Sequence, residues 1–228
     1  MIGIIAAMED EMSILLDKLN LSVYEQVCGC RFYLGKVNET DVVLTTCGVG
    51  KVNAAIAASV MIEFYECKLI VNTGIAGGIT GVNTKDVVIG NKLMYHDFDV
   101  TVFGYAHGQV PGMPKIFNPS LESVVLFKRI LNDLKIDYKE ATIYSGDVFV
   151  SSKEVLKNVD TTIPCIAEME GAAIAHVCVK SGVDFIVVRY VSDIVGEPSQ
   201  IDDYKAFETE MANRSSEICL SILNKLAY

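Results

Sequence analysis

Three consecutive carboxylates, Glu9, Asp10 and Glu11, follow a short apolar run whose composition is typical of a buried strand. Two interpretations are open from these residues alone. Carboxylates suit the first turn of a helix, because they interact favourably with the positive end of the helix dipole. A strand needs no acid at its end for stability. The alternative interpretation is therefore that one of the three carboxylates is a catalytic base.

A second acidic group, Glu168 and Glu170, flanks Met169 directly before residues 171–180, which have a helical pattern closed by Gly182. The negative charge favoured at a helix N-terminus would explain one of these glutamates. Residues two apart in an extended segment point the same way, so the pair brings electrostatic repulsion. Because stability does not explain that repulsion, the pair indicates a functional site.

The apolar run 185–191 contains Arg189 and is followed by Ser192 and Asp193. A buried arginine has to be paired with a negative group. Either glutamate of the 168/170 pair would form a structural ion pair with it. A functional aspartate at a strand terminus is equally natural.

Two glycine-rich segments resemble nucleotide-binding motifs only in part. Residues 48–52 lack the P-loop pattern, because Thr45 stands where that loop needs a glycine and Val52 where it needs a serine or threonine. Residues 74–78 do not have the dinucleotide-binding spacing. We interpret both as tight strand-to-helix turns where the backbone approaches a ligand closely.

The elements that must position these residues alternate between strand and helix. The patterns predict strands at residues 2–7, 31–37, 41–46, 69–72, 86–95, 141–144, 166–169 and 185–191. They predict helices at residues 10–19, 51–65, 121–134, 171–180 and 204–226. This alternation indicates one α/β domain over residues 1–228, with a mostly parallel sheet covered by helices on both faces. Ligands bind beyond the carboxyl ends of the strands in such folds, where the polar residues described above lie.

Composition restricts the possible partners and the compartment. The 228 residues carry a formal net charge of −10, a surface that would repel nucleic acid. The seven cysteines are odd in number and most lie in apolar runs, so we expect reduced thiols in a cytoplasmic protein. The three histidines share no metal-ligand spacing, and we expect no metal. No secretory signal or membrane-spanning run is visible.

Taken together, these segments resemble the 5′-methylthioadenosine/S-adenosylhomocysteine nucleosidases of the nucleoside phosphorylase superfamily. The matching blocks, in the family's order, are IGIIAAMEDE, GVGKVNAA, VNTGIAGG, YHDFDVTVFGYAHGQVPGMP, SGDVF, EMEGAAIAHVC and VVRYVSD. The resemblance implies a central twisted mixed sheet flanked by helices. It also implies hydrolysis, without a cofactor, of the bond joining adenine to a 5′-thio-substituted ribose, with 5′-deoxyadenosine as a further possible substrate.

The resemblance also assigns roles to single residues. Asp193 matches the acid that protonates adenine N7, and Glu11 matches the base that activates water, which leaves Glu9 and Asp10 as solvated helix-start charges. Glu170 matches the ligand of the ribose hydroxyls. The other matching positions contact substrate or support these groups: Met8, Val49, Ile75, Gly77, Phe149, Val150, Met169, Arg189, Ser192 and Tyr204. The family usually has serine where this chain has Ile75, a difference that affects ribose contacts.

The long loop at residues 96–114 has neither a helical nor a strand period. The family is homodimeric, and the resemblance implies that this loop reaches the neighbouring active site. Phe103, Tyr105 and Pro111 match residues that enclose the 5′-thio group from across the interface.

Two other functions stay open at this point. A purine nucleoside phosphorylase would share the fold. A non-catalytic sensor of adenosyl ligands would be favoured if an acid or base position were lost, but Glu11, Glu170 and Asp193 are all present.

Overall fold

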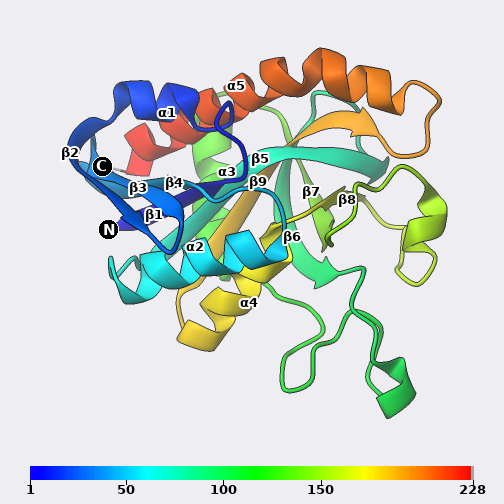
Figure 1. Ribbon diagram of the computed structural model, residues 1–228. Helices are drawn as coiled ribbons and strands as arrows, with labels where there is room; N and C mark the ends of the chain where they lie inside the picture. The colour runs from blue at the N-terminus through cyan, green and yellow to red at the C-terminus, as the bar shows by residue number, and fades with distance from the viewer. Residues whose placement is uncertain (227–228) are drawn as a thin grey trace.

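The computed structural model describes residues 1–226, which form a three-layer arrangement of helices around one mixed sheet (Figure 1). The strands of the described chain are β1 (Ile2–Ala6), β2 (Asn20–Val27), β3 (Cys30–Val37), β4 (Thr40–Thr46), β5 (Leu69–Thr80), β6 (Val87–Tyr95), β7 (Tyr138–Ser145), β8 (Cys165–Glu168) and β9 (Asp184–Ile194). The helices are α1 (Ser13–Lys18), α2 (Lys51–Glu63), α3 (Leu121–Asp133), α4 (Gly171–Ser181) and α5 (Gln200–Leu226), with short 3-10 turns η1 (Thr101–Phe103) and η2 (Lys153–Leu156).

The sheet closes on itself around its longer strands. Its order is β2-β3-β4-β1-β5-β8-β7-β6-β9, and β5 also pairs with β9. Strands β5, β8, β7, β6 and β9 therefore form a ring, and β4, β3 and β2 extend from it through β1. The pairs β1–β4, β1–β5, β5–β9, β6–β7 and β7–β8 are parallel, whereas the remaining pairs are antiparallel. The predicted mixed, mostly parallel α/β fold is confirmed.

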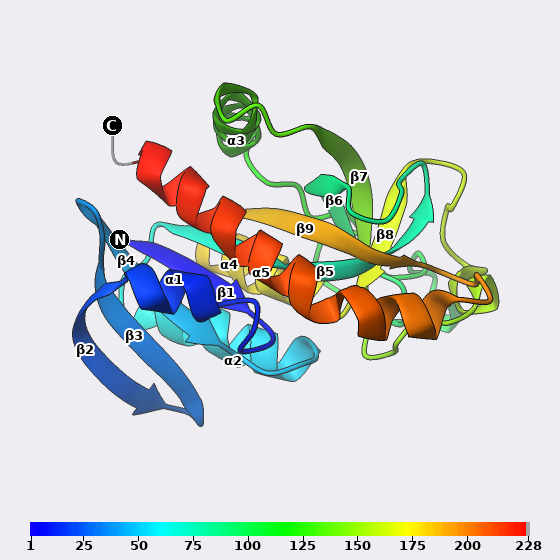
Figure 2. The ribbon, with the colours of Figure 1, turned by 90° about the horizontal axis from the view of Figure 1, so that it is seen from above.

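Helices cover both faces of the sheet. Helices α1 and α5 lie above it and α2 and α4 lie side by side below it in the view of Figure 1, and α5 crosses the sheet diagonally (Figure 2). Each face has its own apolar core: α2 and α4 contribute to one, and α1, α3 and α5 to the other. The alanines Ala54, Ala57 and Ala58 of α2 are fully buried, and their small side chains permit close packing against the sheet and α4.

Most predicted elements are present, but the helix predicted at residues 10–19 starts three residues later than predicted. Helix α1 begins only at Ser13 and has no acidic residue in its first turn, so Glu9 and Asp10 are not helix-start charges. The cause is Glu11, whose side chain turns back to accept hydrogen bonds from the backbone of Ala7 and Met8. Those contacts hold residues 9–12 in a turn between β1 and α1.

The prediction of a tight turn at residues 74–78 is also wrong. These residues lie within β5, which runs to Thr80. They stay extended because β9 pairs with one side of β5 as far as Gly78, and β8 pairs with the other side from Gly77 onward. Strand β9 likewise runs to Ile194, so Asp193 lies inside a strand rather than beyond its end. Strand β2 was not predicted and extends the hairpin of β3 and β4.

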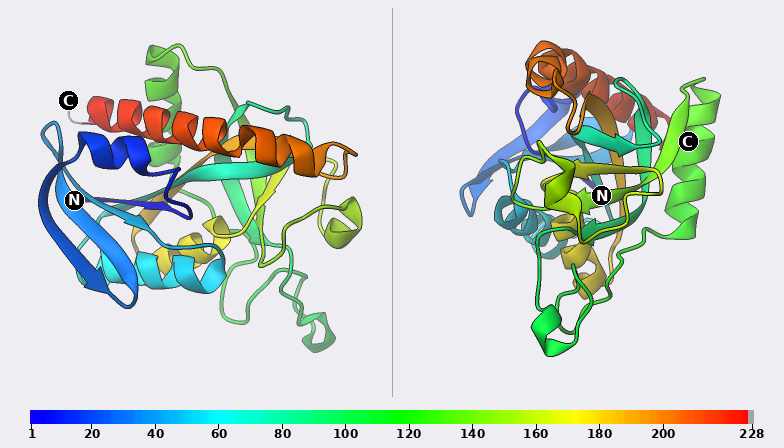
Figure 3. Two further views of the ribbon diagram at one scale, coloured as in Figure 1. Left: turned by 45° about the horizontal axis from the view of Figure 1, so that its top comes forward. Right: turned by 90° about the vertical axis from the view of Figure 1, so that its right-hand side faces the viewer.

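The loop at residues 96–114 has no regular structure apart from η1, as predicted. It extends away from the body of the molecule, below the sheet in both views of Figure 3. None of the helices within residues 1–226 has the length and apolarity needed to cross a membrane.

Candidate active site

A gap in strand pairing along β5 locates the site. On one side, β5 pairs with β1 as far as Asn72 and with β8 only from Gly77. Residues 73–76 therefore have no strand neighbour on that side, while β9 pairs with the other. Backbone N–H groups left in such a gap need another acceptor. The N–H of Ile75 donates to Oε1 of Glu11 at 2.9 Å.

The Glu11 carboxylate is held from three directions. Its Oε2 accepts hydrogen bonds from the backbone N–H groups of Ala7 and Met8, both at 2.9 Å. The side chain is 1% exposed. Burial raises the pKa of Glu11, while the nearby Arg189 guanidinium and the three N–H donors oppose that rise. The result is a rigid carboxylate at the floor of the pocket whose basicity exceeds that of a surface glutamate.

Arg189 is buried in β9 and compensates several acidic groups. It donates to Oδ1 of Asn72 at 2.7 Å and to Oε2 of Glu170 at 3.3 Å, and it forms an ion pair with Glu168. The predicted pairing of Arg189 is confirmed, and both glutamates take part. Its cross-strand neighbour on β5 is Gly74, whose missing Cβ leaves room for the guanidinium.

Glu168 and Glu170 differ in how much hydrogen-bonding capacity they leave for a ligand. Glu168 accepts hydrogen bonds from the backbone of Glu170 and Gly171, at 3.1 and 2.8 Å, and from the Ser145 hydroxyl. Glu170 accepts only one backbone hydrogen bond, from Gly50 at 3.0 Å. Burial, together with the charge of Glu168, raises the pKa of Glu170 to about 7. Glu168 thus stabilises the local structure, whereas Glu170 retains hydrogen-bonding capacity for a ligand.

Asp193 is 1% exposed, on a neighbouring part of the same pocket. Its Oδ1 accepts from the Ser192 hydroxyl at 2.5 Å, and its Oδ2 accepts from the Gln200 side-chain amide at 2.8 Å. Burial raises the pKa of Asp193, whereas the two hydrogen bonds lower it. Its cross-strand neighbour is Gly77, where a Cβ would lie 3.2 Å from Oδ2. A carboxyl group in this setting can carry a proton and deliver it.

Aromatic and apolar residues form the rest of the wall. The rings of Phe149 and Tyr204 meet edge to face, with centroids 5.4 Å apart. The pocket has an empty volume of about 620 Å³, including open solvent at its mouth, which is the size class of small-molecule sites. It contains thirteen of the residues predicted from the sequence: Met8, Glu11, Val49, Ile75, Gly77, Phe149, Val150, Met169, Glu170, Arg189, Ser192, Asp193 and Tyr204.

Three predicted residues do not line this pocket. Phe103, Tyr105 and Pro111 belong to the loop at residues 96–114, and the Phe103 side chain is 76% exposed. Nothing within residues 1–226 brings them to the site.

Two functional side chains escaped the sequence interpretation. Asn72 orients Arg189, and a polar residue closing the apolar run 69–72 was a signal that could have identified it. Gln200 contacts Asp193 from the start of α5, seven residues along the chain. No local pattern distinguishes it from an ordinary helix-start residue.

Comparisons with known proteins identify the family of this chain. Residues 1–224 match the family model described as the phosphorylase superfamily. A curated protein of Staphylococcus haemolyticus (strain JCSC1435) is 41% identical over 99% of this chain and 100% of its own length. One from Geobacillus sp. (strain WCH70) is 38% identical over 99% of this chain and 98% of its own. Both are named 5′-methylthioadenosine/S-adenosylhomocysteine nucleosidase. This chain belongs to that nucleosidase family.

A solved structure of the family has the same fold. The S-adenosylhomocysteine nucleosidase of Streptococcus pyogenes, solved in complex with 5-methylthiotubericidin, superposes with a TM-score of 0.91 at 36% identity. The match covers 99% of this chain and 96% of that one. The membership of the nucleosidase family that the sequence blocks predicted for this chain is therefore confirmed.

Proposed function

We propose that this chain hydrolyses the N-glycosidic bond of 5′-methylthioadenosine and S-adenosylhomocysteine, releasing adenine and the thioribose. The observation that carries the proposal is that one pocket holds a protonatable Asp193 together with Glu11 and the Arg189 charge that acts on it. The names of the relatives and the ligand of the Streptococcus pyogenes enzyme support the substrate class.

The leaving group requires an acid. Adenine departs as a neutral base if a proton reaches N7 while the C1′–N9 bond breaks. Asp193 supplies that proton, because its raised pKa keeps more of it protonated near neutral pH than an ordinary aspartate. Ser192 holds the carboxyl group in place.

The sugar requires negative charge and a base. The ribose develops oxocarbenium character, which Glu11 and Glu170 stabilise electrostatically. Glu11 accepts a proton from the attacking water as the water oxygen bonds to C1′. Arg189 forms an ion pair with Glu170, and its charge also acts on Glu11. Glu170 binds the ribose hydroxyls, and Met169 packs on the sugar.

The remaining wall of the pocket fits the base and the 5′ substituent. Phe149 stacks on adenine, and Tyr204 closes over it from α5. The backbone of Val150 contacts the edge of the base. Met8 and Val49 line the alkylthio region, with Ile75 and Gly77 along the ribose.

The same geometry disfavours phosphorolysis. A phosphate dianion needs arginines, hydroxyls and backbone donors. Glu11 would repel the anion, and its own oxygens already occupy the N–H groups of Ala7, Met8 and Ile75. Arg189 is neutralised by two glutamates. A neutral water molecule fits this environment better. A non-catalytic sensor would have no use for both an acid and a base.

The test is adenine release from 5′-methylthioadenosine, S-adenosylhomocysteine and 5′-deoxyadenosine, with and without phosphate. We expect adenine and free thioribose at a rate that phosphate does not change. Sugar-1-phosphate products, or a rate that rises saturably with phosphate, would establish a phosphorylase. Tight binding without adenine release would establish a sensor.

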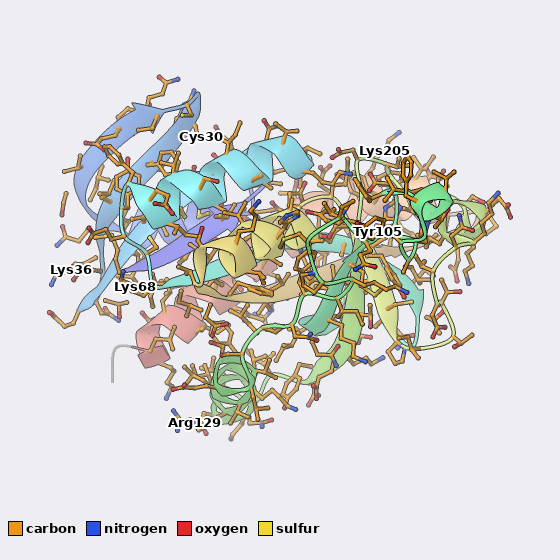
Figure 4. All side chains as sticks on the ribbon, turned by 90° about the horizontal axis from the view of Figure 1, so that it is seen from below. Cys30, Lys36, Lys68, Tyr105, Arg129 and Lys205 are labelled. Atoms are coloured by element: carbon orange, nitrogen blue, oxygen red, sulfur yellow. The ribbon has the colours of Figure 1, made fainter. Side chains whose placement is uncertain are left out.

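We further propose that residues 1–228 act as one nucleosidase domain of a cytoplasmic homodimer. Helices α2 and α4 lie side by side, and the loop bearing Tyr105 lies on the same side of the molecule (Figure 4). An apolar groove there is lined by residues of both helices and of the loop, Val52, Val177 and Val110 among them. A second copy on this face would cover the groove and bring Phe103, Tyr105 and Pro111 to the neighbouring 5′-thio site. Sedimentation showing a fully active monomer at the assay concentration would contradict the dimer.

A further inference from the structure

Gln200 is the first residue of α5 and is 3% exposed, yet the reaction described above gives it no role. All of its side-chain polar groups are used. Nε2 donates one hydrogen bond to Oδ2 of Asp193 at 2.8 Å and another to the carbonyl of Val150 at 2.9 Å. Oε1 accepts from the backbone N–H of Gly196 at 2.9 Å.

These three contacts determine the orientation of the amide. A flipped amide would direct Nε2 at the Gly196 N–H and Oε1 at the oxygens of Asp193 and Val150. It would replace three hydrogen bonds with three repulsive contacts between like groups. The two N–H donors of Gln200 therefore point to the pocket side in a single arrangement.

The two acceptors that Gln200 joins belong to residues that line the pocket, and the proposed reaction places both next to the base. Adenine presents an acceptor at N7 next to a donor, the N6 amino group, on the same edge. A protonated Asp193 complements N7. The Val150 carbonyl complements N6, because a carbonyl oxygen has a second lone pair after accepting from Gln200.

We propose that Gln200 is a positioning residue, whose amide holds the acid Asp193 and the Val150 carbonyl in register with the N7/N6 edge of adenine. This inference rests on the proposed nucleosidase reaction, with Asp193 as its acid. Gln200 acts through these two groups and does not itself transfer a proton. It also links the start of α5 and the acid to the segment at residues 148–150 through hydrogen bonds.

A donor on a carboxylate favours the ionised form. Loss of the Gln200 hydrogen bond therefore raises the pKa of Asp193 further. Since the acid acts when protonated, the alkaline limb of the kcat/KM profile should move to higher pH. Asp203 and Tyr204, both on α5, are the other ionisable groups that interact with Asp193, and the variants below retain them.

The experiment compares Gln200→Met with the wild-type enzyme on 5′-methylthioadenosine. Methionine matches glutamine in length but has no donor. We expect kcat to fall about 10–100-fold, the range of a misplaced catalytic group, and the alkaline limb to shift upward. A second variant, Gln200→Glu, keeps the shape of the side chain and adds a charge next to Asp193. It should shift the alkaline limb further. It also keeps the test possible if the methionine variant does not fold.

Ser199→Ala is the matched control. Ser199 donates to Asp203 at 2.7 Å at the same helix start, whereas the Asp193 carboxylate accepts its side-chain hydrogen bonds from Ser192 and Gln200. It should keep both the wild-type rate and the wild-type limb. Gln200 variants with a wild-type limb, whether or not their rate falls, would overturn the positioning role. A wild-type enzyme that releases no adenine would instead overturn the proposed function, and this inference with it.

Discussion

The substitution Gly74→Ala, which adds a single methyl group, should impair catalysis while the enzyme still folds. Gly74 lies in β5 opposite Arg189, with φ at +150°. A Cβ built there would lie 2.5 Å from Oε1 of Glu11 and even closer to the Arg189 guanidinium. Ordinary van der Waals contact with a Cβ begins at about 3.4 Å. Gly74→Ala therefore requires Glu11 to retreat by the difference, about 0.9 Å, unless β5 moves.

Glu11 has little freedom to retreat. Its two oxygens accept three backbone hydrogen bonds, each 2.9 Å long, and a shift of this size would break or stretch them. A misplacement of about 1 Å lowers the rate of an enzyme roughly 10²-fold. Arg189 is displaced as well, so we expect kcat/KM to fall at least about 10²-fold. The backbone strain of alanine at this φ adds a stability loss of about 1–3 kcal/mol.

The assay measures kcat/KM for 5′-methylthioadenosine together with the melting temperature of each variant. Gly182→Ala is the control, because Gly182 also has a positive φ, +67°, but no atom lies within 4 Å of the position that its Cβ would take. It should lose about 1–2 kcal/mol of stability and keep its activity. A folded Gly74→Ala enzyme within threefold of the wild-type kcat/KM would refute the steric argument. Equal losses of activity in both variants would refute it too.

Four further outcomes follow from the site. Asp193→Asn should lower kcat about 10²–10⁴-fold, the contribution of a general acid; turnover within tenfold of wild type would remove Asp193 from that role. Glu170 has a pKa raised to about 7 from 4.5, so the folded state holds a proton that the unfolded state releases between these values, and stability falls as pH rises through that window. Urea titrations at pH 4.5 and 8 should show Glu170→Gln gaining stability relative to wild type at the higher pH, and an unchanged difference would contradict the raised pKa. Ile75→Ser should leave the products unchanged and alter only rate or sugar affinity; if it created phosphorolysis, Glu11 would not decide the nucleophile. Phe103→Ala should raise KM for 5′-methylthioadenosine about 10–100-fold, because burial of a large apolar side chain contributes about 1.5–3 kcal/mol, and a change below twofold would argue against its place in the neighbouring pocket.

The acidic triplet shows what a local sequence pattern can and cannot predict. The position of the triplet directly after an apolar strand pointed to the ligand edge of an α/β sheet, and the family resemblance selected Glu11 among the three, which does line the pocket. The same pattern misplaced the start of α1 by three residues. Helix propensity and dipole arguments are local, whereas the Ile75 N–H that binds Glu11 is available only because β5 lacks a neighbour at residue 75.

The sequence by itself determined the alternation of strands and helices, the buried arginine that needs an acidic partner, and the carboxylates that gather at the strand ends. These follow from side-chain periodicity and from the high free energy of an unpaired buried charge, both of which are properties of short segments.

Only the tertiary structure decided that β5 and β9 close a ring, that the gap between β1 and β8 receives Glu11, and that Gln200 reaches Asp193 and Val150 together. Strand partners far apart in the chain, and the gaps between them, depend on which long-range pairings satisfy all backbone groups at once. A short stretch of sequence carries no record of that competition, and so the place of Glu11 and Asp193 in the pocket was predictable while the residues and gaps that hold them in place were not.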